Sequence, residues 1–377
     1  TLARLGGDEF VAVLIDFEEK SAVAPLLDRL LAAVAQPIHV EDISLQVSVS
    51  IGVSMYPQSQ EIDGEQLLRQ ADQSMYQAKL AGKNRFQIFD AVQDSSIRSL
   101  HESLEQIRLA LKRREFVLYY QPKVNMRTGQ IVGAEALIRW QHPEQGLLPP
   151  AAFLPIIENH PLAVEIGEWV IGAALLQMEH WVLQGMDVNV SVNIGARQLQ
   201  QGDFVDRLRA ILAMHPRINA SALELEILET SALEDVAQVS QVIEDCTQLG
   251  VSFALDDFGT GYSSLTYLKR LKVKTLKIDQ SFVRDMLDDQ DDLAILHGVI
   301  GLAEALGRHV IAEGVETTAH GTALLQLGCD LAQGYGIARP MPAEQLPAWA
   351  ATWKPDVSWL AVSIPRVESL TGSWAAI

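Results

Sequence analysis

Cysteine is scarce in this sequence of 377 residues, and long uninterrupted apolar runs are missing. The two cysteines, Cys246 and Cys329, lie in apolar surroundings, which predicts buried thiols and argues against a disulfide framework or a cysteine-based metal site. The apolar stretch 164–176 contains Glu165 and Glu168, so it is too short and too charged to span a bilayer. No signal peptide is recognisable. We therefore predict a cytoplasmic protein, or the cytoplasmic end of a larger, membrane-attached one.

Positive charge is also in short supply. The chain has 29 Lys and Arg against 48 Asp and Glu, a formal net charge of -19. Polymeric nucleic acid and anionic membrane surfaces both attract basic patches, so neither is expected as a partner. A small anionic ligand held by a few local cations or metals remains compatible with this balance. The apolar content of 48% and charged content of 20% are ordinary for a globular protein, and the length suffices for two domains.

Low-complexity segments and short-period repeats are absent, so the organisation follows from the pattern of expected elements. Residues 1–90 predict a small α/β unit whose first hairpin carries Gly6-Gly7-Asp8-Glu9 at its tip. So few strands make a poor independent core, and we expect a partner segment outside this sequence. Beyond the hairpin, the expected elements are a helix over 23–35, a strand over 45–54, a helix over 65–80 and an edge strand over 86–89.

Residues 91–114 are polar and helical, with one apolar stripe. Its members are spaced by three and four residues: Ile97, Leu100, Leu104, Ile107 and Leu111. Two interpretations remain open, a single amphipathic helix packed on the following domain and a dimeric coiled-coil connector.

From Glu115 onward, short apolar strands alternate with helical stretches, as in βα units. Eight strands within this region predict an α/β fold of the (β/α)8 barrel type. The first two strands are joined by the short turn 125–130, so we expect them to be antiparallel, which breaks the ideal barrel. The expected strands are 116–121, 131–139, 188–194, 223–228, 251–256, 275–278, 310–312 and 330–332.

Polar side chains stand where these strands end, and in such barrels the functional groups lie at the carboxyl ends. Each one alone has an ordinary explanation as a solvated strand end or a helix cap. Several carboxylates converging on one barrel mouth would repel one another, so the cluster requires cations. The residues are Glu135, Asn193, Glu226, Asp256, Asp257, Lys277, Glu313 and Gln333.

The ligand chemistry of this cluster favours hard cations. Oxygen donors without His or Cys suit Mg²⁺ or Mn²⁺ better than Zn²⁺. The adjacent Asp256 and Asp257 would let one carboxylate bridge two metals, the arrangement that cleaves phosphate esters. In the stretch DDFGTGYSSL, 256–265, Gly259 and Gly261 predict a mobile loop before a helix that opens near Ser263 and Ser264.

The sequence EALIRW at 135–140 resembles the signature of the EAL-domain cyclic di-GMP phosphodiesterases. The resemblance runs from about Leu104 to Trp353. It implies an EAL barrel with one antiparallel strand at 104–353, preceded by a helical linker at 91–103 and followed by a tail at 354–377. Further matching motifs are YYQP at 119–122, SVN at 191–193, DDFGTGYSSL, KID at 277–279, EGVE at 313–316 and QGY at 333–335.

The resemblance implies hydrolysis of cyclic di-GMP to linear 5′-pGpG with two Mg²⁺ or Mn²⁺ ions per site. The catalytic residues would be Glu135, Lys277 and Glu313, where Lys277 orients the attacking water or balances charge and Glu313 is either a general base or a metal ligand. The implied ligands are Glu135, Asn193, Glu226 and Asp256 for one metal, and Asp256, Asp257 and Glu313 for the other.

Further residues are assigned by the same resemblance. Glu229 would anchor the DDFGTGYSSL loop, which couples metal binding to formation of a homodimer through the EAL domain. Gly195 and Leu228 depart from the usual serine and threonine, and neither removes a ligand. The implied substrate contacts are Gln121, Leu137, Arg139 (to a phosphate), Glu316, Gln333 and Tyr335.

The opening stretch resembles the GGDEF signature of diguanylate cyclases, and the resemblance continues through SVSIGVS, ADQSMYQAK and AGKNRF. The resemblance implies a partial GGDEF domain, its carboxyl-terminal half, at 1–90. It implies that Gly6 and Gly7 lie against the nucleotide and that Asp8 and Glu9 serve metal binding and catalysis. Lys79 and Lys83 would face the phosphates, with Lys83 in place of a commoner arginine. The upstream half of such a domain is not in this sequence, so we expect no cyclase activity from this chain.

Three functional interpretations follow. A metal-dependent phosphodiesterase is favoured because the implied ligand set is complete. The first alternative is a catalytically silent receptor for cyclic di-GMP. The second is a dual cyclase and phosphodiesterase in the full-length protein, in which GTP at an intact GGDEF domain regulates hydrolysis through the helix at 97–111.

Overall fold

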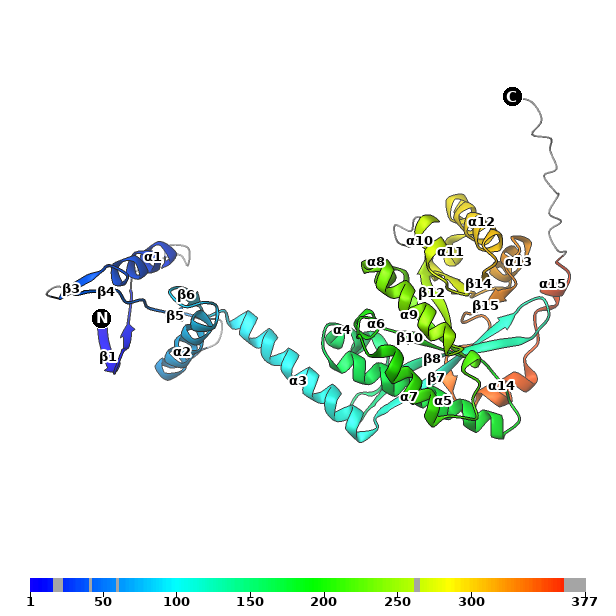
Figure 1. Ribbon diagram of the computed structural model, residues 1–377, viewed down its shortest axis with the longest axis horizontal. Helices are drawn as coiled ribbons and strands as arrows, with labels where there is room; N and C mark the ends of the chain where they lie inside the picture. The colour runs from blue at the N-terminus through cyan, green and yellow to red at the C-terminus, as the bar shows by residue number, and fades with distance from the viewer. Residues whose placement is uncertain (16–22, 41–42, 59–60, 261–264, 363–377) are drawn as a thin grey trace, which may run out of the picture. The chain divides into compact units, whose positions relative to one another are not determined.

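The structure is a computed structural model that describes residues 1–15, 23–40, 43–58, 61–260 and 265–362. Its contacts divide the chain into two compact units, Thr1–Glu102 and Ser103–Ile377, which are described separately (Figure 1). Within the described residues, no helix has both the length and the apolar character that crossing a membrane requires.

The first unit is a small α/β arrangement built from short strands and two helices. β1 pairs antiparallel with β2, β3 pairs antiparallel with β4, and β5 pairs parallel with β6. Helix α2 packs so closely on β5 that a Cβ at Gly52 would lie 1.8 Å from the carbonyl oxygen of Ala71. The elements are β1 Leu2–Gly6, β2 Glu9–Ala12, α1 Val23–Val34, β3 Ile38–Val40, β4 Ile43–Leu45, β5 Ile51–Val53, α2 Gly64–Leu80 and β6 Phe86–Ile88.

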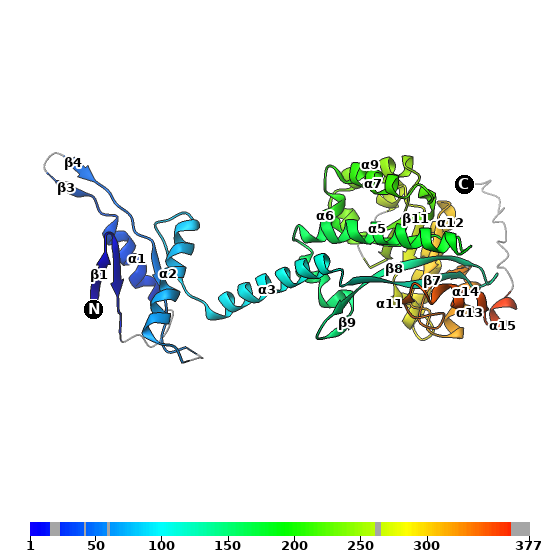
Figure 2. The same ribbon diagram turned by 90° about the horizontal axis from the view of Figure 1, so that it is seen from below.

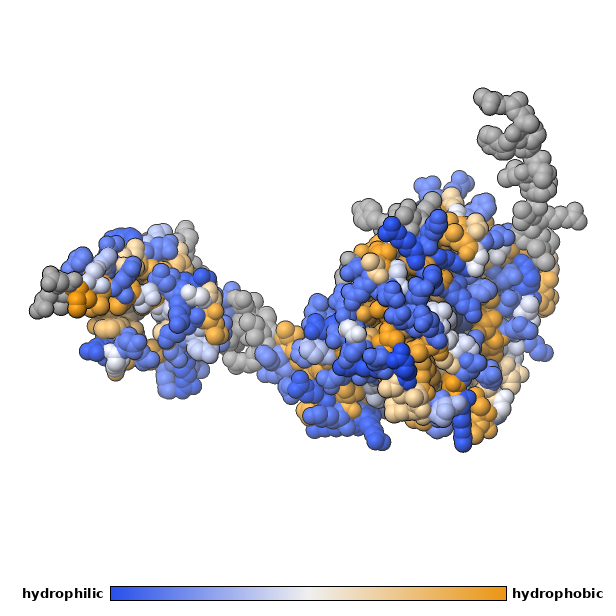
Figure 3. Space-filling model, in the orientation of Figure 1, coloured by the Kyte–Doolittle hydropathy of each residue, from blue (hydrophilic) through white to orange (hydrophobic). Residues whose placement is uncertain are grey.

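The strand expected over 45–54 is interrupted in the structure. β4 ends at Leu45 and β5 begins at Ile51, so residues 46–50 form no ladder with a described strand. A strand needs a neighbour for its backbone groups, and β5 has one only along the three residues that face β6. The apolar core of this unit is correspondingly small: Val23, Leu27 and Ala78 are buried, whereas Leu2 is 72% exposed. Figure 3 shows apolar, orange atoms on the surface of this unit.

Helix α3, Ala91–Arg113, leads from the first unit into the second. In its carboxyl-terminal half, Ile107 and Ala110 are fully buried in the core of the second unit. Leu100, earlier on the same stripe, is 48% exposed. The structure thus supports the amphipathic-helix interpretation for the carboxyl-terminal half of the stripe.

The second unit is the expected eight-stranded barrel. β7 and β8 form a long antiparallel hairpin (Figure 2). From β8 the ring runs through β10, β11, β12, β13 and β14 to β15, each strand parallel to the one before it. β15 closes the ring by pairing antiparallel with β7. β7 is therefore antiparallel to both of its barrel neighbours, as predicted. The barrel strands are β7 Phe116–Asn125, β8 Ile131–His142, β10 Val190–Ile194, β11 Leu223–Leu228, β12 Ser252–Phe258, β13 Thr275–Ile278, β14 His309–Ala312 and β15 Leu331–Ala332.

Two short strands extend the sheet beyond the barrel: β9, Gly146–Leu148, pairs with β8, and β16, Met341–Pro342, pairs with β7.

Helices cover the outside of the barrel (Figure 1). The predicted helix opening at Ser263 and Ser264 lies outside the described residues. The helices are α4 Leu154–Ile157, α5 Leu162–Leu183, α6 Ala196–Leu199, α7 Phe204–Met214, α8 Glu229–Glu234, α9 Val236–Gln248, α10 Leu265–Arg270, α11 Gln280–Asp285, α12 Gln290–Ala305, α13 Thr318–Gln326, α14 Leu346–Thr352 and α15 Val357–Leu360, with 3-10 turns at Pro150–Ala152 and Ala220–Ala222.

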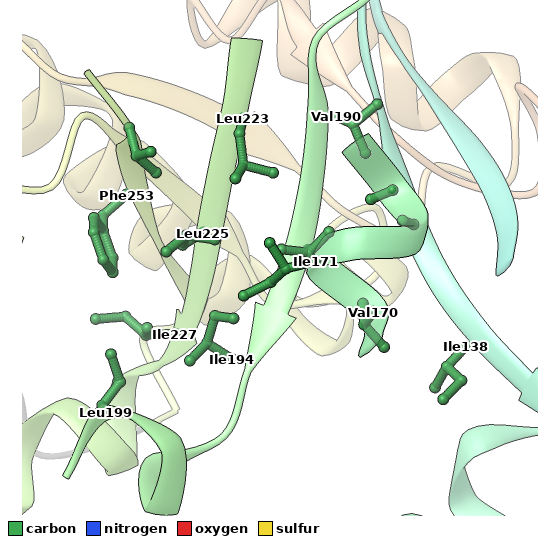
Figure 4. Packing of buried hydrophobic residues seen from close by; sticks show 14 of the residues in the cluster. Ile138, Val170, Ile171, Val190, Ile194, Leu199, Leu223, Leu225, Ile227 and Phe253 are labelled. Carbon is green, nitrogen blue, oxygen red and sulfur yellow. The ribbon is translucent and has the colours of Figure 1, made fainter. Parts of the chain in front are cut away.

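Apolar and polar residues alternate along β11, so their side chains lie on opposite faces of the strand. On β11, Leu223, Leu225 and Ile227 are fully buried in the apolar layer that packs against α5 and neighbouring helices (Figure 4). Glu224 and Glu226 occupy the intervening positions, so they point to the other face of the strand, into the barrel. The outer apolar layer thereby fixes which side chains reach the barrel interior.

The packing of α3 gives a stability prediction. Ile107→Ala should destabilise the second unit by about 2–5 kcal/mol, because it removes a fully buried side chain. Leu100→Ala on the same stripe should change stability by no more than about 0.5 kcal/mol. Denaturant unfolding of the full chain measures both. Equal losses accompanied by a shift from dimer to monomer would instead support the coiled-coil interpretation.

Candidate functional site

One lysine at the centre of the barrel is surrounded by carboxylates. Lys277 on β13 is 1% exposed, and its ammonium group contacts side chains delivered by β8, β11, β12 and the residue after β14. From Lys277 Nζ the distances are 3.4 Å to Glu135 Oε2, 2.5 Å to Glu226 Oε2, 3.0 Å to Asp256 Oδ1 and 2.7 Å to Glu313 Oε1. The predicted convergence of strand-end carboxylates on one point is therefore present.

The carboxylates form two overlapping groups that could each hold a metal ion. In the first, oxygen atoms of Glu135, Glu226 and Asp256 lie within 4.8 Å of one another, and in the second the same is true of Asp256, Asp257 and Glu313. Asp256 belongs to both. The donor atoms are all oxygens, which fits Mg²⁺ or Mn²⁺ and not a thiolate-preferring metal.

The electrostatics of the mouth also favour a bound cation. Burial, together with neighbouring carboxylates, raises the pKa values of Asp256 and Asp257 to about 6 and that of Glu313 to about 8. Lys277 lowers these three pKa values, but less than burial and the neighbouring carboxylates raise them. A divalent cation between these oxygens would stabilise their ionised forms, because an adjacent positive charge favours the carboxylate.

A local irregularity brings the two adjacent aspartates together. Asp257 has a left-handed backbone, φ 53°, and the pairing of β12 with β13 shifts register between Leu255 and Phe258. Neighbouring side chains on a regular strand point to opposite faces, whereas this bulge lets Asp256 and Asp257 approach the same Glu313. A non-glycine residue in this conformation is uncommon and costs about 1–2 kcal/mol, a cost often found at functional sites.

Two amide side chains donate hydrogen bonds to Glu135, and a third amide is bonded to one of them. Asn193 Nδ2 donates to Glu135 Oε1 at 2.8 Å, and Gln333 Nε2 donates to Glu135 Oε2 at 2.6 Å and to Gln121 Oε1 at 3.0 Å. Gln121 in turn donates to the carbonyl oxygen of Ala338. These bonds fix the orientation of the Glu135 carboxylate. Gln333 Oε1 is buried and has no partner among the described residues, so it is available to a ligand.

The remaining predicted substrate residues lie on β8 and in the segments after β14 and β15. Leu137 and Arg139 come after Glu135 on β8, and both are half-buried. The Arg139 guanidinium lies 5.7 Å from the Tyr119 ring centroid, and burial lowers its pKa. Tyr335 is 53% exposed, and Glu316 is also exposed.

Arg339 was not identified from the sequence. Its guanidinium carbon lies 4.3 Å from the Tyr335 ring centroid, so a second arginine accompanies the predicted substrate residues. The stretch after the QGY motif has no regular strand or helix pattern, and this left the sequence without a signal for it.

Glu229 holds the start of the DDFGTGYSSL loop. It is 1% exposed at the first position of α8, and its Oε2 accepts a hydrogen bond from the backbone N–H of Gly259 at 2.8 Å. Residues 261–264 of the loop lie outside the described residues. The contact agrees geometrically with the anchoring role expected for Glu229, and the role itself stays a prediction.

The sequence did not predict a second polar layer, which we call the lower tier: Lys123, Ser191, Glu224 and Thr275. Lys123 is 2% exposed, and its Nζ lies 2.7 Å from Glu226 Oε1 and 3.2 Å from Glu224 Oε1. Burial alone would lower the pKa of Lys123, but Glu226 and Glu224 raise it. Burial alone would likewise raise the pKa of Glu226, whereas Lys123 and Lys277 lower it to about 2. The available signal was a charged residue in an apolar strand, two positions after Gln121.

The GGDEF signature occupies the tip of the β1–β2 hairpin. Gly6 ends β1, Glu9 begins β2, and the turn between them has Gly7 at φ 54°, a left-handed conformation that suits glycine. Asp8 and Glu9 belong to neither of the carboxylate groups found among the described residues. Lys79 in the last turn of α2 and Lys83 after it are exposed. The predicted roles of these residues stay predictions.

Comparisons with known families and structures agree with this architecture. The family model for the EAL domain matches residues 104–340, and the model for the diguanylate cyclase GGDEF domain matches residues 1–85. A solved structure described as the PaMucR phosphodiesterase in complex with c-di-GMP is 45% identical, with a TM-score of 0.63 over 65% of this chain and 99% of that one. The FimX EAL domain of Pseudomonas aeruginosa, bound to c-di-GMP, is 28% identical, with a TM-score of 0.58 over 64% of this chain and 96% of that one.

Curated relatives match this chain over most of its length. The bifunctional diguanylate cyclase/cyclic di-GMP phosphodiesterase MucR of Pseudomonas aeruginosa is 42% identical over 352 residues, which are 93% of this chain and 51% of MucR. The cyclic di-GMP phosphodiesterase NbdA of the same organism is 36% identical over 95% of this chain and 45% of NbdA. The chain thus spans about half the length of these relatives. EAL domains depend on divalent metal, in keeping with the acidic clusters of the barrel. The chain belongs to the EAL-domain family, and a GGDEF-domain segment precedes its barrel in the sequence.

Proposed function

We propose that the barrel hydrolyses cyclic di-GMP to linear 5′-pGpG with the help of two Mg²⁺ or Mn²⁺ ions. The observation that carries the proposal is the pair of carboxylate groups that share Asp256 at the carboxyl ends of the strands. Two cations held in this way suit in-line displacement at a phosphodiester. The names of the relatives MucR and NbdA and the c-di-GMP complex of PaMucR support the choice of substrate.

The ligand assignment follows the two groups. Glu135, Asn193, Glu226 and Asp256 would hold one cation, and Asp256, Asp257 and Glu313 would hold the other. When bound, the cations would polarise the phosphate and lower the pKa of the attacking water.

The protein's own groups would orient and balance this site. Lys277 keeps Glu135, Glu226, Asp256 and Glu313 turned toward one point and offsets part of their charge. Its ammonium can also donate to the attacking water or to a phosphate oxygen. We assign Glu313 to the ligand set and not to the general base, because its carboxylate lies in one group with Asp256 and Asp257.

Substrate contacts would come from the residues around the mouth. Arg139 presents a guanidinium that can pair with a phosphate, and the exposed ring of Tyr335 can stack on a base. Gln333 can offer Oε1, which has no hydrogen-bond partner in the described part of the chain, to a donor on the substrate. The other proposed contacts are Gln121, Leu137 and Glu316.

For the whole protein, we propose a cytoplasmic homodimer formed through the EAL domain. The bond between Glu229 and Gly259 would connect the metal site to the loop that supports the dimer. GTP at an intact GGDEF domain would modulate hydrolysis through α3. The buried free thiols of Cys246 and Cys329 suit a reducing compartment.

The proposed activity is tested by product formation. The chain with cyclic di-GMP and Mg²⁺ or Mn²⁺ should yield pGpG. Glu135→Ala should lower kcat/KM by at least about 100-fold, because it removes a proposed ligand that hydrogen bonds from two amide side chains orient. Glu165→Ala, on the exposed first turn of α5, is the matched control and should retain the wild-type rate. Tight substrate binding without product in either metal would instead identify a silent receptor.

The sharing of Asp256 predicts metal stoichiometry. By calorimetry or Mn²⁺ electron paramagnetic resonance, the wild-type chain should bind two Mn²⁺ ions and Asp257→Asn should bind one, since it removes a ligand of only one group. Asp256→Asn should weaken both sites by about 10-fold or more. Loss of only one site in Asp256→Asn would contradict the bridging role. Glu165→Ala serves again as the control and should retain both sites.

A further inference from the structure

The lower tier is a compact hydrogen-bonded unit that the proposed chemistry does not use. Lys123 Nζ donates to Ser191 Oγ and to Glu224 Oε1, and Ser191 Oγ donates to Glu224 Oε1 at 2.9 Å. Thr275 Oγ1 donates to the other oxygen, Glu224 Oε2, at 2.8 Å. Glu224 is thus held through both of its oxygens, and it fixes Lys123 in turn.

The lower tier reaches the proposed metal site through a single carboxylate. Glu226 is 1% exposed, and each of its oxygens faces a different lysine. Oε1 lies 2.7 Å from Lys123 Nζ, and Oε2 lies 2.5 Å from Lys277 Nζ. Lys123 therefore contacts the oxygen that Lys277 does not, so the two lysines together constrain the rotation of the Glu226 carboxylate.

Packing alone does not account for a lysine at this position. A buried ion pair contributes little net stability compared with apolar side chains of similar size, because desolvation opposes the attraction. The tier also borders a cavity of about 930 Å³, which Lys123, Ser191, Glu224 and Thr275 all help to line. The lower tier therefore lies next to a cavity, and close packing does not require a charged side chain at the position of Lys123.

Lys123 forms ion pairs with two carboxylates, and this favours a role in orienting them. Lys123 bridges Glu224 on one side and Glu226 on the other, and these carboxylates are two residues apart on the same face of β11. Without Lys123, the buried carboxylate of Glu226 and the half-buried carboxylate of Glu224 would lie near each other with one cation fewer. Glu226 would then be free to rotate or to repel its neighbour, and its approach to Asp256 and Glu135 would change.

We propose that Lys123 is a positioning residue of the metal site, which holds Glu226 through Oε1 and is itself held by Glu224, Ser191 and Thr275. The inference rests on the proposed function, because it assumes that Glu226 is a metal ligand. Side chains that orient a ligand from behind commonly determine metal affinity by about 10–100-fold. Lys123 would act on metal binding and would not touch the substrate.

The test compares Lys123→Met with the wild-type chain in Mn²⁺ titration by electron paramagnetic resonance and in pGpG formation. We expect Mn²⁺ affinity to fall by about 10–100-fold. At saturating Mn²⁺, the KM for cyclic di-GMP should stay within about 3-fold of wild type, since Lys123 makes no substrate contact. A general loss of structure would not produce this separation. Lys272→Met, on an exposed lysine paired with Glu244, is the matched control and should behave as wild type.

Each outcome decides the matter. If wild type neither binds Mn²⁺ nor forms pGpG, the proposed function fails and this inference fails with it. If wild type does both, and folded Lys123→Met binds Mn²⁺ within about 2-fold of wild type, only the role of Lys123 is contradicted. If Lys123→Met shows no cooperative melting, Lys123→Gln, which keeps a hydrogen-bond donor, is judged by the same affinity criterion.

Discussion

The arrangement of the barrel depends on the buried ammonium group of Lys277. Four carboxylates approach it from β8, β11, β12 and the end of β14, and without it they would repel one another inside a low-dielectric interior. Such a contact is possible only when the strands close into a ring and each delivers its side chain at one level. The apolar layer outside the strands, with Leu223, Leu225 and Ile227 buried, provides that closure.

The antiparallel direction of β7 determines how the interior is layered. In the register of β7 with β8, Gln121 lies opposite Glu135 and Lys123 lies opposite Gly133. Because β7 runs against its neighbours, the earlier residue Gln121 stands nearer the mouth and the later residue Lys123 stands deeper. The one reversed strand thus supplies an amide beside the proposed ligands and a cation beneath them, from positions only two residues apart.

The sequence predicted the barrel well because each strand carries its own local pattern. The bounds of β11 and β13 agree with expectation to the residue, and the short turn after β7 was enough to predict its direction. The strand ends also predicted which carboxylates meet.

The lower tier was missed because Lys123 and Glu224 are separated by 101 positions, and only the register of a closed ring shows that they are in contact. The left-handed Asp257 and the break in the strand expected over 45–54 depend on tertiary pairing, which local patterns do not encode.

The position of Asp256 in both carboxylate groups has a thermodynamic consequence. An ion in either group would fix the same side chain, so the free energy of filling one position would depend on whether the other is filled. Linkage of this kind is reciprocal, whichever position fills first. Positive linkage would make the doubly loaded state rise more steeply with free cation concentration than independent positions would. The steepness with which the two positions fill as cation concentration rises would therefore report how strongly the shared Asp256 couples them.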